Sequence, residues 1–265
     1  MMSFSGYKTL KFARDGRVLR VTIDGNGPLN PVDDALHSEL ARVFTEIQGD
    51  AESDVVVLTG AGRAFCAGGD MDWFQAMIEE PTKFCGIVPD AKRIIFGLLE
   101  LEKPIVCRLN GAAAGLGASV ALLCDIIVAD ETAKIGDPHV AMGLVAGDGG
   151  AIIWPQLVGY ARAKEMLLTG EMMSARDAAA WGLINHAVPA AELDAKTDDI
   201  IAKLVNGATW AVRWTKTAIN IPLRALAANI TDAAVAYEIL SQVHPDHQEA
   251  VAAFRDKRRP YFSVG

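Results

Sequence analysis

Apolar and polar residues follow one another along the chain in blocks that predict strands followed by helices. Short runs of branched apolar residues are typical of buried strands, and four of them stand at residues 18–23, 55–58, 105–107 and 126–128. An aspartate at 33 or 34 can cap a helix with one apolar face, formed by Leu36, Leu40, Val43, Phe44 and Ile47. Another helical pattern near residues 91–101 precedes the run at 105. This alternation predicts an α/β core with mainly parallel strands.

The pattern changes after about Gly159 and becomes almost wholly helical from residue 191 onwards. Ser174 can begin a short helix with Asp177 in its first turn, and Gly182 can end that helix. Longer helices are expected over residues 225–240 and 247–258. We therefore expect an α/β core at residues 1–190 and a helical region at 191–265. A helical tail of this kind often packs on a neighbouring subunit, so we expect a homo-oligomer.

Two glycine-rich turns each stand between an apolar run and an expected helix. The first reads Phe65-Cys66-Ala67-Gly68-Gly69-Asp70, and the second covers residues 110–117 with the sequence NGAAAGLG. A turn at the start of a helix leaves backbone N–H groups unpaired and directed outward. Two such turns that face each other can hold one developing oxyanion, which predicts an enzyme acting on a carbonyl group.

Other interpretations of these turns explain less of the sequence. Gly115-Leu116-Gly117 could begin a dinucleotide-binding motif, but a third glycine would fall at position 120, where the chain has Val120. Glycines also occur simply to permit tight turns. The presence of both turns, in this order and spacing, favours a paired function over two unrelated bends.

Charge and cysteine content narrow the classes of partner. The 265 residues carry a net charge of -8, so we expect no nucleic-acid binding, and an anionic ligand would need a local basic patch. The spacing of the four cysteines predicts free thiols, with neither a metal site nor a disulfide framework. Residues 1–6 lack the features of a secretion signal, and no apolar run reaches the ~18 residues of a membrane span. We expect a cytoplasmic protein that does not bind membranes.

Longer motifs resemble those of one enzyme family. Residues 60–70, GAGRAFCAGGD, resemble the first signature of the crotonase, or enoyl-CoA hydratase/isomerase, superfamily, and residues 110–125, NGAAAGLGASVALLCD, resemble its second. Shorter matches extend to AFRDKR at residues 253–258, so the resemblance covers essentially the whole chain. It implies a crotonase-like spiral of ββα units, a C-terminal helical trimerisation region, and a homotrimer or a hexamer built from two trimers. It also implies an acyl-CoA substrate, with coenzyme A as part of that substrate and no tightly bound cofactor.

The same resemblance implies roles for individual residues. The N–H groups of Gly69 and Leu116 would form the oxyanion hole, with Leu116 standing where many members have glycine. Coenzyme A would lie near four residues of the core and be reached by two residues of the C-terminal tail of a neighbouring subunit: Leu29, Arg63, Ala67 and Met71, and Phe254 and Lys257. Arg63 and Lys257 would supply the positive charge that an acidic protein needs to bind phosphates.

The chain departs from the hydratase pattern where that family has two catalytic glutamates, because Ser119 and His139 occupy those positions. Asp148 follows in the same loop, and a carboxylate can orient an imidazole as a general base for water. The loop at residues 139–155 resembles that of 6-oxocamphor hydrolase, a crotonase relative that cleaves a carbon–carbon bond in a β-diketone. The simpler alternatives are an ordinary loop histidine and an aspartate that caps the helix expected near Gly149.

The sequence leaves functions of two classes open. The first hypothesis is an enoyl-CoA hydratase-like lyase of fatty acid metabolism, in which His139, oriented by Asp148, activates water. The second is a hydrolase that uses the same water to split a β-keto or diketone carbon–carbon bond by a retro-Claisen reaction, with an isomerase as a further alternative. A scaffold that binds acyl-CoA without turnover represents the other class. Candidates for the acyl pocket are Phe74, Met77, Phe84, Met142 and Trp154, whereas the histidines other than His139 belong to no recognisable cluster.

Overall fold

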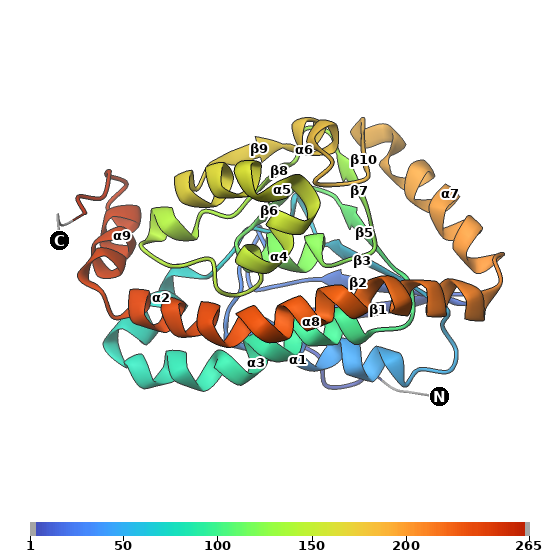
Figure 1. Cartoon of the computed structure of the whole chain (residues 1–265), viewed down its shortest axis with the longest axis horizontal. Coiled ribbons are helices and arrows are strands. Elements are labelled where there is room, and N and C mark those ends of the chain that lie inside the picture. The colour runs from blue at the N-terminus through green and yellow to red at the C-terminus, as the bar shows by residue number, and fades with distance from the viewer. Residues whose placement is uncertain (1–3, 263–265) are drawn as a thin grey trace.

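The computed structural model describes residues 4–262, in which two sheets are wrapped by helices (Figure 1). The larger sheet has the strand order β1-β2-β3-β5-β7-β10. Its strands are β1 (Leu10–Asp15), β2 (Val18–Ile23), β3 (Val55–Gly60), β5 (Ile105–Leu109), β7 (Ile126–Asp130) and β10 (His186–Val188). Only the pair β1–β2 in this sheet is antiparallel, and the other neighbours are parallel. The predicted α/β class with mainly parallel strands is confirmed.

A smaller sheet is built from four short strands in the order β4-β6-β8-β9. They are β4 (Ala64–Cys66), β6 (Ala112–Ala114), β8 (Lys134–Gly136) and β9 (Met172–Ser174). The chain passes three times from the larger sheet to the smaller one and then into a helix: β3 to β4 to α2, β5 to β6 to α4, and β7 to β8 to the 3-10 helix η1 and α5. This repeated path is the predicted spiral of ββα units.

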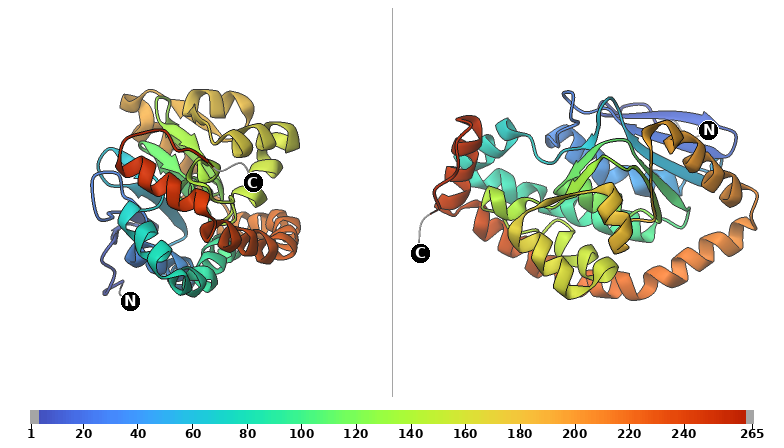
Figure 2. Two further views of the ribbon diagram at one scale, coloured as in Figure 1. Left: turned by 90° about the vertical axis from the view of Figure 1, so that its left-hand side faces the viewer. Right: turned by 90° about the horizontal axis from the view of Figure 1, so that it is seen from above.

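The helices cover the sheets and complete the chain. In the first part they are α1 (Asp34–Gln48), α2 (Met71–Glu79), α3 (Pro81–Glu100) and α4 (Leu116–Leu122). The second part contains η1 (His139–Met142), α5 (Gly150–Thr169), α6 (Ala175–Trp181), the 3-10 helix η2 (Ala190–Glu192), α7 (Leu193–Val205), α8 (Thr209–Gln242) and α9 (Pro245–Arg255). The long helix α8 runs beside α3, and α9 lies at the far end of α8 from α7 (Figures 1 and 2).

The sequence signals for where helices begin and end agree with the structure at several points. Asp33 caps α1 by accepting from the N–H of Leu36, Ser174 caps α6, and Gly182 ends α6 with a positive φ. Other boundaries differ from the prediction. Helix α3 begins at Pro81, earlier than expected, and includes Pro89, whereas α8 begins at Thr209, well before the expected residue 225, and ends at Gln242, close to the expected end. Strand β1 and the three-residue strands were not predicted.

The helical region from residue 191 packs on the α/β core of the same chain, and it also leaves apolar side chains exposed. Helix α7 covers β5 and β7 with Leu193, Ile200 and Ile201, which join a small apolar cluster on that face of the sheet. Helix α8 keeps several large apolar side chains exposed: Trp210, Trp214, Ile219, Ile221, Tyr237 and Leu240. The oligomer and the boundary at 190/191 stay predictions, and residues 1–3 and 263–265 of the two expected regions lie outside the described residues.

Within residues 4–262, no helix combines the length and the apolar character that crossing a membrane requires.

Candidate active site

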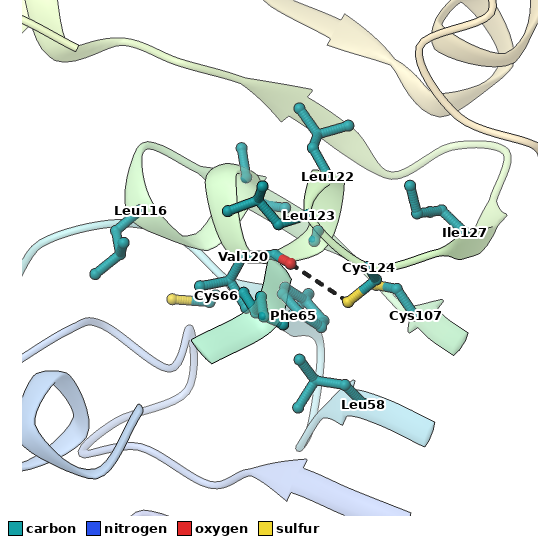
Figure 3. Packing of buried hydrophobic residues seen from close by; sticks show 14 of the residues in the cluster. Leu58, Phe65, Cys66, Cys107, Leu116, Val120, Leu122, Leu123, Cys124 and Ile127 are labelled. Carbon is teal, nitrogen blue, oxygen red and sulfur yellow. Dashed lines mark hydrogen bonds between the residues drawn. The ribbon is translucent and has the colours of Figure 1, made fainter. Parts of the chain in front are cut away.

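The two glycine-rich turns lie directly against each other. Strand β4 pairs with β6, so that Cys66 stands beside Ala113. A Cβ placed on Gly117 would lie 2.2 Å from the carbonyl oxygen of Cys66, and one on Gly68, whose φ is +93°, would lie 3.3 Å from the carbonyl oxygen of Ala114. A side chain at Gly117 would force the turns apart, and one at Gly68 would be strained by the positive φ. Figure 3 shows the packing around them, including the Cys124 thiol, which donates to the carbonyl of Val120 at 3.3 Å.

Gly69 and Leu116 each present an N–H group that is not used by the fold. Gly69 forms a parallel bridge with Val32, in which Val32 donates to the Gly68 carbonyl and accepts from the Asp70 N–H. The Gly69 N–H therefore stays out of that bridge. Leu116 is the first residue of α4, where a backbone N–H has no partner inside the helix. Neither N–H donates a hydrogen bond to any residue in the described range, and both residues line the same cavity.

That cavity has a volume of about 670 Å³ and is mostly apolar. Leu29, Ala67, Met71 and Phe254, four of the six residues expected near coenzyme A, line it. Phe254 reaches it from its own chain, because Arg255 ties α9 to α2 through Asp72 and the Met71 carbonyl. The two expected cations, Arg63 and Lys257, are exposed and are not among the described residues lining the cavity, whereas Arg258 is.

The cavity also contains most of the expected acyl-pocket residues. Phe74, Met77, Phe84 and Met142 line it, together with Trp73 and the buried His37. Trp154 does not, because its side chain is fully buried in the main hydrophobic core. The prediction for Trp154 is therefore wrong.

His139 stands in this cavity between two carboxylates. It begins η1 directly after Pro138, and Asp137 Oδ1 makes a short contact with its Nδ1. On the other side of the ring, Asp148 Oδ2 lies 3.4 Å from Nε2, and Asp148 Oδ1 accepts from the Ser119 hydroxyl at 3.3 Å. Asp148 does not cap a helix, since Gly149 precedes α5 without a side-chain cap. The structure thus unites His139, Asp148 and Ser119, as the sequence suggested, and adds Asp137.

The two carboxylates decide the protonation of the imidazole. Burial alone would lower the pKa of His139, but the negative charges of Asp137 and Asp148 outweigh burial and raise that pKa well above its ordinary value. A ring whose two nitrogens both face acceptor oxygens can satisfy them only as the doubly protonated imidazolium. The two carboxylates therefore favour the protonated form of His139. The sequence predicts that Asp148 orients a neutral His139. In the structure, the carboxylate closer to the imidazole is that of Asp137.

The donor atoms of Asp137, His139 and Asp148 lie within 4.8 Å of one another, close enough to consider a metal ion. A ligating imidazole must offer a lone pair to the ion. Here each ring nitrogen is directed at a different carboxylate, on opposite edges of the ring. The arrangement fits a hydrogen-bonded chain of charges better than a shared ion, and the absence of a metal stays a prediction.

Glu238 adds a buried acid that sequence analysis missed. It comes from α8, lines the cavity and is 7% exposed. Its Oε2 lies so close to Gly147 that a Cβ there would be 2.6 Å away. Burial, and then the neighbouring charge of Asp148, raise the pKa of Glu238 from its usual 4.5 to about 8. The protonated, neutral form of this carboxyl therefore predominates at pH 7. Its sequence signal is a glutamate on the helix face of Ala234 and Val235, both buried.

We expect Glu238→Gln to change how stability depends on pH. The folded protein keeps the Glu238 proton up to about pH 8, whereas the unfolded chain loses it near pH 4.5. Because the folded state binds the extra proton in this window, the contribution of Glu238 to the free energy of unfolding falls as the pH rises from 4.5 to 8. Glutamine cannot ionise, so urea unfolding at several pH values should show a shallower decline for the variant. Identical slopes for variant and wild type would contradict a buried acid.

Comparisons with known proteins identify the family of the chain. The family model described as enoyl-CoA hydratase/isomerase matches residues 13–264. The short-chain-enoyl-CoA hydratase of Clostridium acetobutylicum is 34% identical, over 93% of this chain and 94% of that protein. The crystal structure of an enoyl-CoA hydratase/isomerase from Mycobacterium paratuberculosis is 35% identical with a TM-score of 0.85, covering 92% of this chain and 97% of that one. A β-diketone hydrolase from the cyanobacterium Anabaena, solved with (S)-3-oxocyclohexyl acetic acid, is 29% identical with a TM-score of 0.84, covering 91% and 96%.

The family match extends over both signatures, the His139 loop and the C-terminal helices, and the fold agrees with solved structures over nearly their whole length. The chain therefore belongs to the enoyl-CoA hydratase/isomerase family of the crotonase superfamily.

Proposed function

We propose that this protein is an enoyl-CoA hydratase-like lyase that adds water to the double bond of an enoyl-CoA. The observation that carries the proposal is the pair of unused N–H groups, on Gly69 and Leu116, in the same cavity as His139 and Asp148. An oxyanion needs fixed donors of this kind, and addition of water needs a group that takes its proton. The two N–H groups and the His139–Asp148 pair support the assignment of these two roles. We further propose that the enzyme is cytoplasmic and works as a homotrimer or hexamer.

In this proposal the thioester oxygen is bound by the N–H groups of Gly69 and Leu116. The His139–Asp148 pair accepts a proton from water, and the water oxygen bonds to Cβ. The electron pair of the double bond moves to the thioester, whose oxygen carries the enolate charge between the two donors. Cα then takes a proton, for which the neutral Glu238 is the available donor. The His139–Asp148 pair then releases the proton it took from water, and Glu238 takes up a proton again, by exchange with solvent.

The same groups support a second function, hydrolysis of a carbon–carbon bond. Here the activated water would attack a β-keto carbonyl, and the bond between that carbon and Cα would break to give an enolate in the same hole. The resemblance of the His139 loop to 6-oxocamphor hydrolase and the likeness to the Anabaena β-diketone hydrolase favour this alternative. A third possibility is isomerisation of the double bond, which would need only proton transfer at Cα and Cγ. The description of the matching family, enoyl-CoA hydratase/isomerase, includes isomerases.

Mass spectrometry of two incubations separates these functions. Crotonyl-CoA should gain one water and stay a single product if the protein is a lyase. Acetoacetyl-CoA should be split into two acyl products if it is a hydrolase, and that result without hydration of crotonyl-CoA would overturn the main proposal. Binding of a broad acyl-CoA panel with no turnover would indicate a scaffold and contradict both enzymatic functions.

A further inference from the structure

Asp137 is a buried carboxylate to which no motif of the chain assigns a role. It lies between β8 and η1, and its side chain is fully buried. Its Oδ1 contacts His139 Nδ1 and accepts from the His139 backbone N–H at 3.4 Å. One oxygen thus binds both the ring and the backbone of the same histidine, which fixes the orientation of the imidazole.

The second oxygen of Asp137 is also buried, and it has no hydrogen-bond partner in the described part of the chain. It lies against the start of α5, where a Cβ on Gly150 would be only 2.0 Å from it. The absence of a side chain at Gly150 therefore leaves the space that this carboxylate occupies. A helix start favours a negative charge, but the direct partner of Asp137 is His139.

The other titratable groups around the imidazole of His139 add no net charge next to it at neutral pH. Glu238 of α8 is neutral, as described above. Burial lowers the pKa of His247 on α9, whose Nδ1 is paired with the Met142 carbonyl at 2.7 Å, and burial also lowers the pKa of His37 on α1. The charged groups that remain are one imidazolium and two carboxylates, Asp137 and Asp148.

We propose that Asp137 is a positioning residue that holds His139 as an imidazolium, so that Asp148, and not His139, is the proton acceptor of the reaction. With Asp137 on Nδ1, the imidazolium directs its Nε2 proton at Asp148 and has no lone pair with which to act as a base. Asp148 keeps lone pairs beside this bond and the Ser119 hydroxyl. The statement about the acceptor rests on the proposed function, whereas the charge state of His139 can be measured without turnover.

The test is the protonation state of His139, read by NMR of protein with 15N-labelled histidine rings. The signal is assigned by its loss in His139→Gln. We expect both ring nitrogens of wild-type His139 to remain protonated from pH 6 to pH 8. In Asp137→Asn, which keeps the size of the side chain but removes its charge, His139 should become a neutral tautomer within this range. A neutral His139 in the wild type at pH 7 would overturn the proposal, even if the variant fails to fold.

Activity provides the second measurement. Asp137→Asn should lower kcat at pH 7 by roughly 100-fold, because the buried Asp148 carboxylate binds a proton more readily without an adjacent cation and is then less available as a base. The variant should leave KM nearly unchanged. Its pH–rate profile should also move. The matched control is Asp199→Asn on the exposed side of α7, where Asp199 pairs with Lys203; this variant should leave the NMR signal and the rate unchanged. An unchanged charge state or an unchanged profile in Asp137→Asn would contradict the proposal. Absence of turnover in the wild type would refute only the proposed function.

Discussion

Replacing Asp148 with asparagine is expected to lower kcat by roughly 10²- to 10⁴-fold, the usual contribution of general acid–base catalysis, while the Kd for acyl-CoA changes little. Asparagine keeps the size of the side chain but cannot take up a proton. Asp148 lines the cavity with its Oδ2 3.4 Å from His139 Nε2, and it is not one of the residues expected to contact coenzyme A. Steady-state kinetics on the substrate that is turned over, with binding by calorimetry, measures the two effects separately.

Ser119→Ala is the matched control for this variant. It removes the hydroxyl that donates to Asp148 Oδ1 at 3.3 Å, but leaves the carboxylate and its contact with His139. A single hydrogen bond of this kind contributes about 1 kcal/mol, so kcat should fall by less than about 10-fold. If Asp148→Asn were as active as Ser119→Ala, Asp148 would not be the group that takes the proton.

Leu116→Pro is expected to lower kcat by roughly 10²- to 10³-fold, because it removes one N–H of the oxyanion hole. The fold should tolerate the change. Leu116 is the first residue of α4, a position that proline favours, and its N–H donates to no residue between 4 and 262. The preceding Gly115, with φ 53° and ψ -125°, lies outside the helical region that a following proline disfavours.

Leu116→Ala distinguishes the N–H from the side chain. Both variants lose the buried leucine side chain, but alanine keeps the N–H group. Circular dichroism and thermal unfolding would show that both are folded. We expect Leu116→Ala to retain most of its kcat and Leu116→Pro to lose it. Equal kcat values in the two variants would remove Leu116 from the oxyanion hole.

The parts of the site that could be predicted are those encoded by local sequence. The glycine turns appear as short motifs because close contact between backbones leaves no room for a Cβ, as at Gly117 against Cys66. His139 and Asp148 stand in one loop, so their pairing could be expected from the sequence. Glu238 could not be found in this way, since only the packing of α8 across the cavity brings it to the site.

Asp137 was missed for a different physical reason. It is only two residues from His139, but its role depends on the turn into η1, which bends the carboxylate back onto Nδ1. In the fold, too, the elements that could not be predicted are those that depend on contacts and not on a local sequence pattern. The long apolar strands and the capped helices could be predicted, whereas the three-residue strands β4, β6, β8 and β9 carry too few residues for a period and form because neighbouring strands pair with them.

The central claim is that Gly69 and Leu116 stabilise the enolate of an acyl-CoA thioester, whichever reaction follows. The most direct test is exchange at Cα of saturated butyryl-CoA in D₂O, measured by mass spectrometry, since only enolate formation exchanges that hydrogen. We expect deuterium incorporation with the wild type and Leu116→Ala, and its loss with Leu116→Pro. A wild-type protein that binds butyryl-CoA without exchange, or Leu116→Pro exchanging at the wild-type rate, would contradict the central claim.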